Sequence, residues 1–319
     1  MIHVLPLGID IGATRIRVAV AERRRDGTIR ILGIASRERA DCNEAERDAA
    51  AVAVLEDLSR ELGLRRQREC VSALGSPQAT LRNVRFPKMS WLERRNAARF
   101  EALGEYGGTS RKPIRVRLHS IDRTSGVFAV GMVDEMLLRH HVDILRRARL
   151  RVAGVDHDAC ALQRVLGDVD AVVDIGYETL RLHVFLEGAP LSWTAGVGGV
   201  DVTRCIASDL LIDTASAERR KRILGVAGAG ESARESCVEA ICALIEEARA
   251  GGVRVSEIGF IGNGARLPGV VESVAERTDV RVRTPVSLLM RTARLSDEAV
   301  ECGSPDWTLA AALTTWRAA

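Results

Sequence analysis

The sequence predicts an α/β protein made of two domains of like fold, with a small ββαβ unit inserted into the first. The duplication is indicated by LGIDIGATRIRVAV at residues 7–20 and AVVDIGYETLRLHVF at residues 171–185. Each stretch predicts an apolar strand, an Asp-Ile-Gly turn and a second apolar strand. Apolar residues at helical spacing, as in NEAERDAAAVAVLEDLSRELG, predict helices between the strands.

The composition is that of a soluble globular chain with enough residues for two domains. The chain has 319 residues, of which 46% are hydrophobic and 28% charged, with a formal net charge of +3. This weak positive charge and an aromatic content of 3% argue against a nucleic-acid partner. Seven cysteines without a CxxC pair indicate a reducing, cytoplasmic compartment. We expect no signal peptide and no membrane span, because no apolar run of about 18 residues occurs.

The first part of the chain is predicted to open with three strands, then a helix, two strands and a second helix. The Asp26-Gly27 turn favours antiparallel pairing of the opening strands, and Gly63 stands where the first helix would end. Ser90 and Glu93 form a capping box at the start of the second helix. The opening strands are predicted over Val4–Ile11, Ile16–Ala21 and Ile29–Ser36.

The predicted insert has two strands, a helix and a third strand, and we expect it to form a sheet of its own. Its adjacent histidines His140 and His141 diverge on a helix, so they do not form a metal pair, and both are expected at the surface. The predicted elements are Ile114–Ile121, Val127–Val133, Asp134–Arg149 and Arg151–Asp156.

The second half repeats the three-strand opening and then becomes mainly helical. The segment FIGNGARLPG at residues 260–269 predicts a strand, a glycine turn and a helix, followed by a short strand and a closing helix. The predicted strands are Ala171–Ile175, Leu180–Leu186, Leu191–Thr194 and Val280–Val282, and the helices lie near residues 199–211, 215–224, 231–250 and 306–317.

The repeated Asp-Ile-Gly motif has a chemical interpretation. Asp10 aligns with Asp174, and a glycine directly after a buried strand lets backbone N–H groups turn toward phosphate oxygens. An aspartate at a strand end can hold hydrated Mg²⁺. The tripeptide alone is a common strand-to-turn sequence, but its duplication on matching hairpins favours two hairpins that face each other across a cleft and bind a triphosphate with its metal.

A third glycine motif supports a nucleotide ligand. Gly262 and Gly264 stand between a predicted strand and helix, where they allow a flat ligand such as adenosine to approach the backbone. The segment is not a dinucleotide fingerprint, because Leu267 stands where the last glycine would be.

These three motifs resemble the first phosphate, second phosphate and adenosine motifs of the actin-like ATPase superfamily. Within it, the chain resembles the PilM family of type IV pilus assembly and, more distantly, FtsA, through RFPKMSWLERRNAARFEALGEY, GVDHDACALQRVLGDVDAVVDIG and GAPLSWTAGVGGVDVTRCIASDL in the same order. The resemblance implies duplicated ribonuclease H-like domains. Domain I would comprise residues 1–86 and 304–319, the insert 87–156, and domain II 157–303, with a helical subdomain at about 199–255.

The resemblance implies ATP as the ligand, with Asp10 and Asp174 positioning Mg²⁺ through water. The chain departs from the family pattern at Ala13, where a serine is usual, and at Arg17, where a lysine is usual. We therefore expect ATP binding with slow or absent hydrolysis, and only Asp156 and Gln163 suggest themselves as a base. The implied ATP-binding residues are Gly12, Ala13, Thr14, Arg15, Arg17, Gly176, Tyr177, Glu178, Thr179, Gly198, Gly199, Gly262, Asn263, Gly264 and Ala265.

The family's partner is a PilN-like inner-membrane protein, whose cytoplasmic N-terminal segment would dock near residues 85–155. The chain would meet the membrane only through this and other pilus assembly proteins. Two alternatives stay open, namely a pseudo-ATPase scaffold that binds no nucleotide and a small-molecule kinase on the same fold. Oligomeric state and polymerisation are also open.

Overall fold

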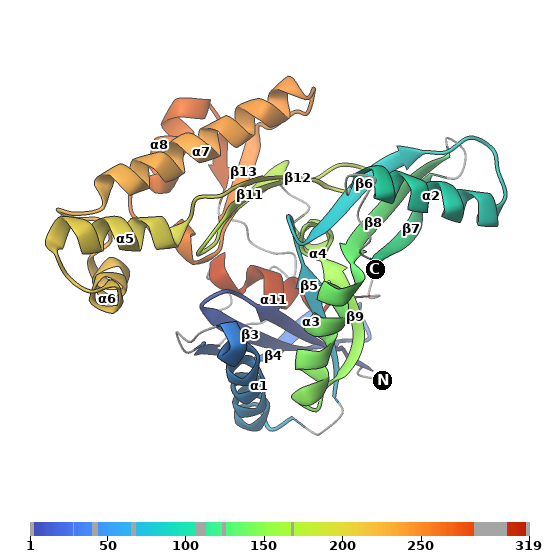
Figure 1. The fold of residues 1–319 in the computed structure, drawn as a ribbon, viewed down its shortest axis with the longest axis horizontal. Helices are drawn as coiled ribbons and strands as arrows, with labels where there is room; N and C mark the ends of the chain where they lie inside the picture. The colour runs from blue at the N-terminus through green and yellow to red at the C-terminus, as the bar shows by residue number, and fades with distance from the viewer. Residues whose placement is uncertain are drawn as a thin grey trace. The chain divides into compact units, whose positions relative to one another are not determined.

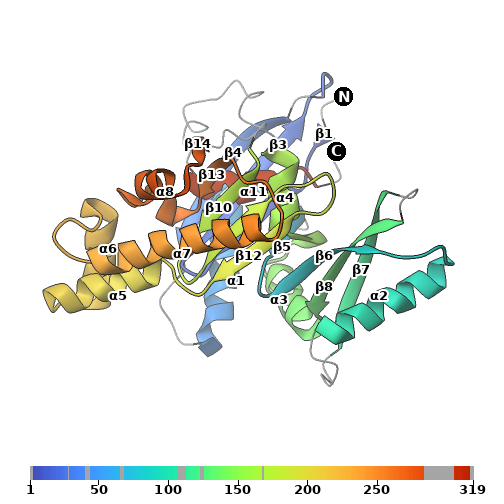
Figure 2. The same ribbon diagram turned by 90° about the horizontal axis from the view of Figure 1, so that it is seen from above.

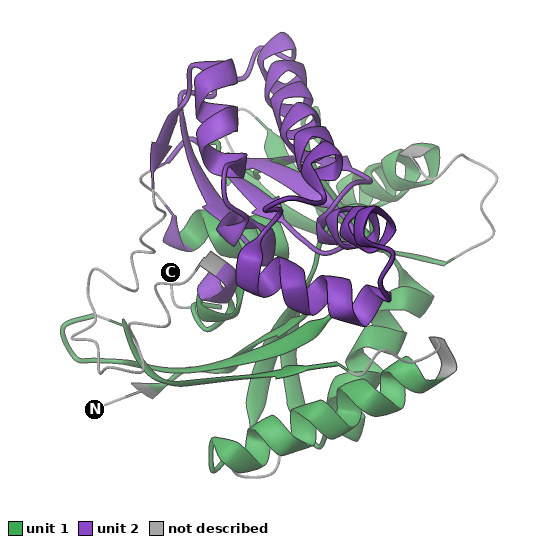
Figure 3. Ribbon diagram, turned by 90° about the vertical axis from the view of Figure 1, so that its left-hand side faces the viewer, with its two compact units in different colours: residues 1–164, 185–191, 309–319 green, residues 165–184, 192–308 purple. Residues whose placement is uncertain are grey.

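The computed structural model describes residues 3–27, 29–39, 44–64, 68–105, 113–122, 126–166, 169–283 and 305–316. The chain divides into two compact units, each described here by itself (Figure 3). Unit 1 comprises residues 1–164, 185–191 and 309–319, and unit 2 comprises residues 165–184 and 192–308. No helix within the described ranges has both the length and the apolar character needed to cross a bilayer.

Unit 1 contains a six-stranded sheet with the order β1-β3-β2-β5-β9, in which β4 also pairs with β3. Figure 1 labels β3, β4, β5 and β9 of this sheet. The antiparallel pairing of the opening strands is as the sequence predicts, although the first predicted strand is divided into β1 and β2, while β5 and β9 run parallel to β2. The strands are β1 (His3–Val4), β2 (Leu7–Ile11), β3 (Arg15–Arg23), β4 (Ile29–Glu38), β5 (Glu69–Leu74) and β9 (Arg151–His157).

Helices cover this sheet. Helices α1 (Glu44–Glu61) and α3 (Glu135–Arg147) contact each other and join one hydrophobic core with β2 and β3. Helix α4 (Asp158–Val165) follows β9 directly, and α11 (Thr308–Leu313) packs on β2 at Gly8, where a Cβ atom would stand 1.9 Å from the Ala310 carbonyl oxygen. Only glycine therefore fits at that position of β2.

The prediction that His141 lies at the surface is wrong. The side chain is buried on α3, and its Nε2 atom lies 3.0 Å from Ser72 Oγ, which in turn donates to the Ile9 carbonyl oxygen at 2.8 Å. His140, one position earlier, is exposed and pairs with Asp48. Adjacent helical residues point in different directions, so one of the two faces the core.

The small sheet of unit 1 differs from the predicted ββαβ unit. Its order is β6-β8-β7, and α2 packs against it (Figure 2). The segment Arg151–His157, predicted as its last strand, pairs instead with β5 in the six-stranded sheet. The insert therefore has the order β-α-β-β, because the partner of β8 is a strand far earlier in the chain. These elements are β6 (Ala79–Arg85), α2 (Trp91–Glu105), β7 (Ile114–Asp122) and β8 (Val127–Asp134).

Unit 2 repeats the central arrangement of unit 1. Its sheet has the order β12-β11-β10-β13-β14, with β10 antiparallel to β11 and parallel to β13, as β2 is antiparallel to β3 and parallel to β5. The strands are β10 (Ala171–Ile175), β11 (Leu180–Val184), β12 (Leu191–Ala195), β13 (Glu257–Ile261) and β14 (Arg281–Arg283), and the helices are α5 (Gly199–Leu210), α6 (Thr214–Leu224), α7 (Glu231–Ala250) and α8 (Val270–Thr278).

Candidate nucleotide-binding site

The first hairpin, in unit 1, joins β2 to β3 through a tight turn. The Gly12 N–H donates to the Arg15 carbonyl oxygen at 3.0 Å and leaves Ala13 and Thr14 at the tip. A Cβ atom on Gly12 would stand 2.9 Å from that oxygen, so the turn favours glycine. Arg39, directly after β4, contacts the turn, because its Nη1 atom donates to the Gly12 carbonyl oxygen at 3.0 Å.

The second hairpin, in unit 2, joins β10 to β11 through the same kind of turn. The Gly176 N–H donates to the Thr179 carbonyl oxygen at 3.0 Å, and Tyr177 and Glu178 form the tip. A Cβ atom on Gly176 would stand 2.8 Å from that oxygen. The repeat that the sequence shows is therefore also a repeat of turn geometry.

Each hairpin also carries an ion pair at the same register. Asp10 lies opposite Arg17, and its Oδ2 atom is 3.2 Å from Arg17 Nη1. Asp174 lies opposite Arg181, and its Oδ2 atom is 3.5 Å from Arg181 Nη1. Both aspartates therefore have an arginine partner on the neighbouring strand.

Helix α5 begins against the second turn. The Gly199 N–H donates to the Gly176 carbonyl oxygen at 3.1 Å, and the Val200 N–H donates to the Tyr177 carbonyl oxygen at 2.8 Å. A Cβ atom on Gly198 would stand 2.6 Å from that same Tyr177 oxygen, so the approach requires glycine. The partial positive charge at the N-terminus of this 12-residue helix favours an anion beside the turn.

The third glycine motif lies against Asp174. Gly262 follows β13 with φ +83° and ψ 168°, and a Cβ atom there would stand 2.6 Å from Asp174 Oδ1. Gly264, in the short 3₁₀ helix Asn263–Arg266, packs on the Ile175 side chain in the same way. Unit 2 thus brings together Asp174, the turn 176–179, Gly198 and Gly199, and the segment 262–265.

Two residues beside the second turn are absent from the sequence-based site. Lys221 of α6 donates from Nζ to the Gly199 carbonyl oxygen at 2.7 Å and pairs with Glu218 at 2.7 Å. Its Nζ atom also lies 5.8 Å from the centre of the Tyr177 ring. Burial lowers the pKa of Lys221, although Glu218 opposes the shift. The sequence could have drawn attention to Lys221, because it is one of three lysines in a chain whose other basic side chains are arginines or histidines.

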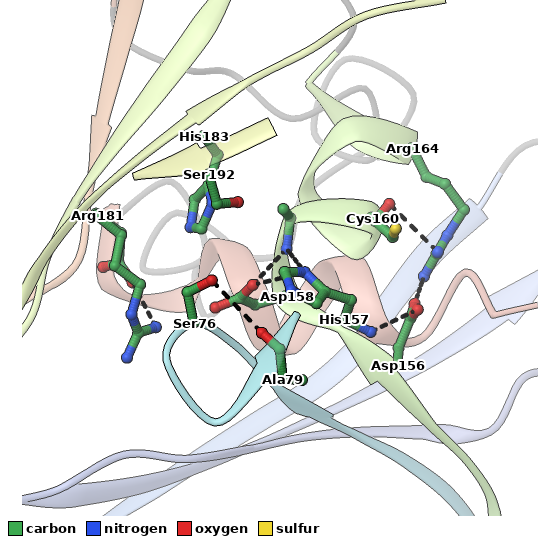
Figure 4. A network of polar contacts seen from close by, with 12 residues as sticks. Ser76, Ala79, Asp156, His157, Asp158, Cys160, Arg164, Arg181, His183 and Ser192 are labelled. Atoms are coloured by element: carbon green, nitrogen blue, oxygen red, sulfur yellow. Dashed lines mark hydrogen bonds and ion pairs between the residues drawn. The ribbon is translucent and has the colours of Figure 1, made fainter. Parts of the chain in front are cut away.

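The two residues suggested as a base, Asp156 and Gln163, are engaged elsewhere in unit 1. Asp156 lies at the end of β9, two strands from β2, and its Oδ2 atom is 2.6 Å from Arg164 Nη2 (Figure 4). Burial raises the pKa of Asp156, although the Arg164 guanidinium opposes this. Gln163 donates its amide to the carbonyl oxygens of Leu186 and Gly188, so its side chain holds the segment 185–191.

A further buried carboxylate starts α4. Asp158 lies 3.1 Å from His157 Nδ1 (Figure 4). The Ala159 N–H donates to the same carboxylate. A Cβ atom on Gly75 would stand 1.7 Å from Asp158 Oδ2, so the loop after β5 passes directly over this carboxylate. Burial lowers the pKa of His157, but the hydrogen bond and charge of Asp158 outweigh it and raise the value overall.

The donor chemistry of the two hairpin aspartates does not fit a Mg²⁺ site. Mg²⁺ binds carboxylate oxygens together with phosphates and water, and it is favoured by uncompensated negative charge. Asp10 and Asp174 are each compensated by a guanidinium instead. Among the described residues, no group of three or more His, Cys, Asp or Glu side chains is placed to hold a metal ion.

Comparison with known proteins gives structural matches only. No family model matches the chain, and no curated protein matches it. A chain in the solved PilM–PilN type IV pilus biogenesis complex is similar over 98% of both chains, with a TM-score of 0.82 and 22% identity. The chain has the actin-like ATPase fold. The ethanolamine utilization protein EutJ from Carboxydothermus hydrogenoformans is similar over 97% of this chain and 90% of its own, with a TM-score of 0.61 and 15% identity. The predicted actin-like α/β fold class is confirmed, and only the make-up of the insert differs from the prediction.

Proposed function

We propose that the chain is an ATP-binding, actin-like scaffold of a type IV pilus or related inner-membrane assembly complex. In this role it would lie in the cytoplasm and bind the N-terminal cytoplasmic segment of a PilN-like membrane protein, through which it would meet the membrane. The proposal is supported by the similarity in fold to a chain of the PilM–PilN complex.

The matching turn geometry of the two hairpins carries the nucleotide part of the proposal. The turns at Gly12–Arg15 and Gly176–Thr179 close with the same hydrogen bond, and both leave backbone N–H groups at a tip. Such N–H groups bind phosphate oxygens. In unit 2 the start of α5 adds an anion-favouring helix end, and the glycines at 262 and 264 let their segment pack closely on Asp174 and Ile175.

We expect hydrolysis to be slow or absent. Hydrolysis requires a group that orients and deprotonates a water molecule. Asp156 is ion-paired with Arg164, and the Gln163 amide is bonded to main-chain carbonyls. Ala13 at the first tip has no hydroxyl to donate to a phosphate. Binding without turnover suits a scaffold better than an enzyme.

Adding ATP should raise the melting temperature of the purified chain. A ligand present at a hundred times its Kd stabilises the native state by about 2.7 kcal/mol. Differential scanning fluorimetry with ATP, ADP and AMP measures the effect, and we expect the order ATP, ADP, AMP because the hairpins would bind phosphates. An unchanged melting temperature with all three nucleotides would argue for the scaffold that binds no nucleotide.

The helix α2 offers the most exposed apolar surface near the proposed partner site. Four of its apolar side chains point to solvent, and we name them the α2 face: Trp91, Leu92, Phe100 and Leu103. Trp91 is 66% and Phe100 77% exposed, which is unusual for aromatic residues on a packed helix. Ala98 and Ala102 pack the helix on the small sheet. We propose that the α2 face contacts the PilN-like segment.

Replacing Trp91 and Phe100 with alanine should weaken binding of a PilN-like N-terminal peptide at least about tenfold, since buried aromatic anchors dominate such interfaces. Fluorescence anisotropy with a labelled peptide measures this affinity. The matched control is Ile223→Ala on α6, where an apolar side chain is 79% exposed outside the α2 face. Equal affinities of the double variant and the control would place the peptide elsewhere.

A further inference from the structure

The two hairpins share a feature that ATP binding alone does not require, which is an arginine opposite each aspartate. Arg17 on β3 faces Asp10 on β2, and Arg181 on β11 faces Asp174 on β10. The Nη1-to-Oδ2 distances are 3.2 Å and 3.5 Å. A guanidinium group therefore occurs opposite the aspartate in both repeats. The ion pair is thus a property of the duplicated motif and not of one hairpin.

Both pairs are partly withdrawn from water. The Arg17 side chain is 7% exposed and that of Asp10 18%, while the Arg181 and Asp174 side chains are 26% and 18% exposed. Arg17 Nη1 lies 3.9 Å from the position of a Cβ atom on Gly12, so the guanidinium is close to the first turn. Ion pairs with this burial are screened much less than exposed pairs, so each guanidinium is attracted strongly to its aspartate and keeps its position beside it.

A fixed guanidinium at each aspartate changes what each hairpin can bind. It compensates the carboxylate that would otherwise attract a hydrated Mg²⁺, and it repels the dication. It also favours phosphate, because a guanidinium presents five N–H donors in a planar fork that matches phosphate oxygens. The arginine can therefore supply, near the turn, the positive charge that Mg²⁺ brings to a bound polyphosphate.

We propose that this chain binds nucleotide phosphates without a divalent metal, and that Arg17 in the first hairpin and Arg181 in the second each supply the positive charge that Mg²⁺ would bring. The inference rests on the proposed ATP binding and specifies its ligand as the metal-free nucleotide anion. It reverses the expectation that Asp10 and Asp174 position Mg²⁺ through water. In this arrangement the two aspartates orient the guanidinium groups. The absence of a metal at the phosphates also accords with slow or absent hydrolysis.

The decisive measurement compares ATP binding by the wild-type chain in excess MgCl₂ and in excess EDTA. Titration with a fluorescent N-methylanthraniloyl ATP gives Kd in both buffers without relying on turnover. We expect the two Kd values to agree within about fivefold, because the arginines supply the charge in both cases. Binding that is stronger in MgCl₂ by more than this factor would overturn the inference and leave the proposed ATP binding intact. Absence of binding in both buffers would overturn both.

Variants test the two arginines themselves. The double variant Arg17→Gln and Arg181→Gln should bind ATP in EDTA at least about tenfold more weakly than wild type, and MgCl₂ should restore part of the loss. The control is Arg37→Gln with Arg281→Gln, which removes two arginines that pair with Glu61 and Glu257 in the two units.

Retention of wild-type affinity in EDTA by the arginine double variant would contradict the roles of Arg17 and Arg181. Circular dichroism shows whether each variant is folded. The single variant Arg181→Gln, at the more exposed pair, provides a milder substitution, and the wild-type comparison does not depend on any variant.

Discussion

Replacing Gly262 with alanine is expected to lower the free energy of unfolding by about 3 kcal/mol or more and to abolish ATP binding. The backbone at Gly262 has φ +83° and ψ 168°, a region that essentially only glycine occupies. A Cβ atom there would also stand 2.6 Å from both Asp174 Oδ1 and the Ile175 carbonyl oxygen. The substitution therefore adds backbone strain and displaces the aspartate of the second hairpin.

Gly252 provides the matched control for this substitution. It has a similar φ of +80°, but a Cβ atom there would meet nothing within 4 Å. Gly252→Ala should cost only about 1 kcal/mol, the ordinary price of a positive φ for alanine. Urea unfolding followed by circular dichroism gives both free energies. If the two variants lost equal unfolding free energy, the predicted clash with Asp174 would add nothing to the cost of the substitution. The close packing of segment 262–265 on β10 would then be contradicted.

The hairpins could be predicted from the sequence because their signals are local. Each consists of two apolar strands joined by a short turn that contains a glycine, and the position of Asp10 opposite Arg17 follows from strand register over a few residues. The same holds for Asp174 and Arg181. The sequence alignment of the two motifs did not reveal that each arginine forms an ion pair with the aspartate opposite it and compensates its charge.

The make-up of the small sheet could not be predicted from local pattern. The strand Arg151–His157 is adjacent in sequence to the helix of the predicted insert, yet it pairs with β5, from which it is separated by β6, α2, β7, β8 and α3. Alternation of apolar residues indicates a strand but does not name its partner. The contacts of Lys221 with Gly199 and Tyr177 could not be predicted for the same reason, since they join α6 to the start of α5 and to the turn after β10.

The burial of His141 could have been predicted. It lies three and four residues before Ile144 and Leu145, which are both buried on α3, and this spacing places all three on one face of the helix. The sequence interpretation gave weight to the polarity of histidine and not to its position on the apolar stripe. Ser72 is the hydrogen-bond partner of the buried imidazole: its Oγ atom accepts the imidazole N–H and donates its own hydrogen to the Ile9 carbonyl oxygen.

This buried histidine should make the chain sensitive to mild acid. Burial, with a smaller effect from the charge of His140, lowers the pKa of His141 from 6.5 to about 4. Since the folded value lies below the unfolded one, the stabilisation is complete above about pH 6.5 and is lost progressively as the pH falls toward 4. The difference corresponds to roughly 3 kcal/mol over that range, of which roughly 2 kcal/mol is lost by pH 5.

The variant His141→Gln separates this effect from the titration of carboxylates. Glutamine keeps an N–H donor for Ser72 but does not titrate, so the loss of unfolding free energy between pH 7.5 and pH 5 should be smaller than in wild type by roughly 2 kcal/mol. His140→Gln, at the exposed neighbour, should leave the loss close to that of wild type. Urea unfolding at the two pH values measures each loss.

Because Ser72 bonds to Ile9, next to Asp10, protonation of His141 should also loosen the strand that precedes the first turn, and ATP binding should weaken over the same pH interval. An equal pH dependence in wild type and His141→Gln would show that the pKa of His141 is the same in the folded and the unfolded chain, contrary to its burial beside Ser72.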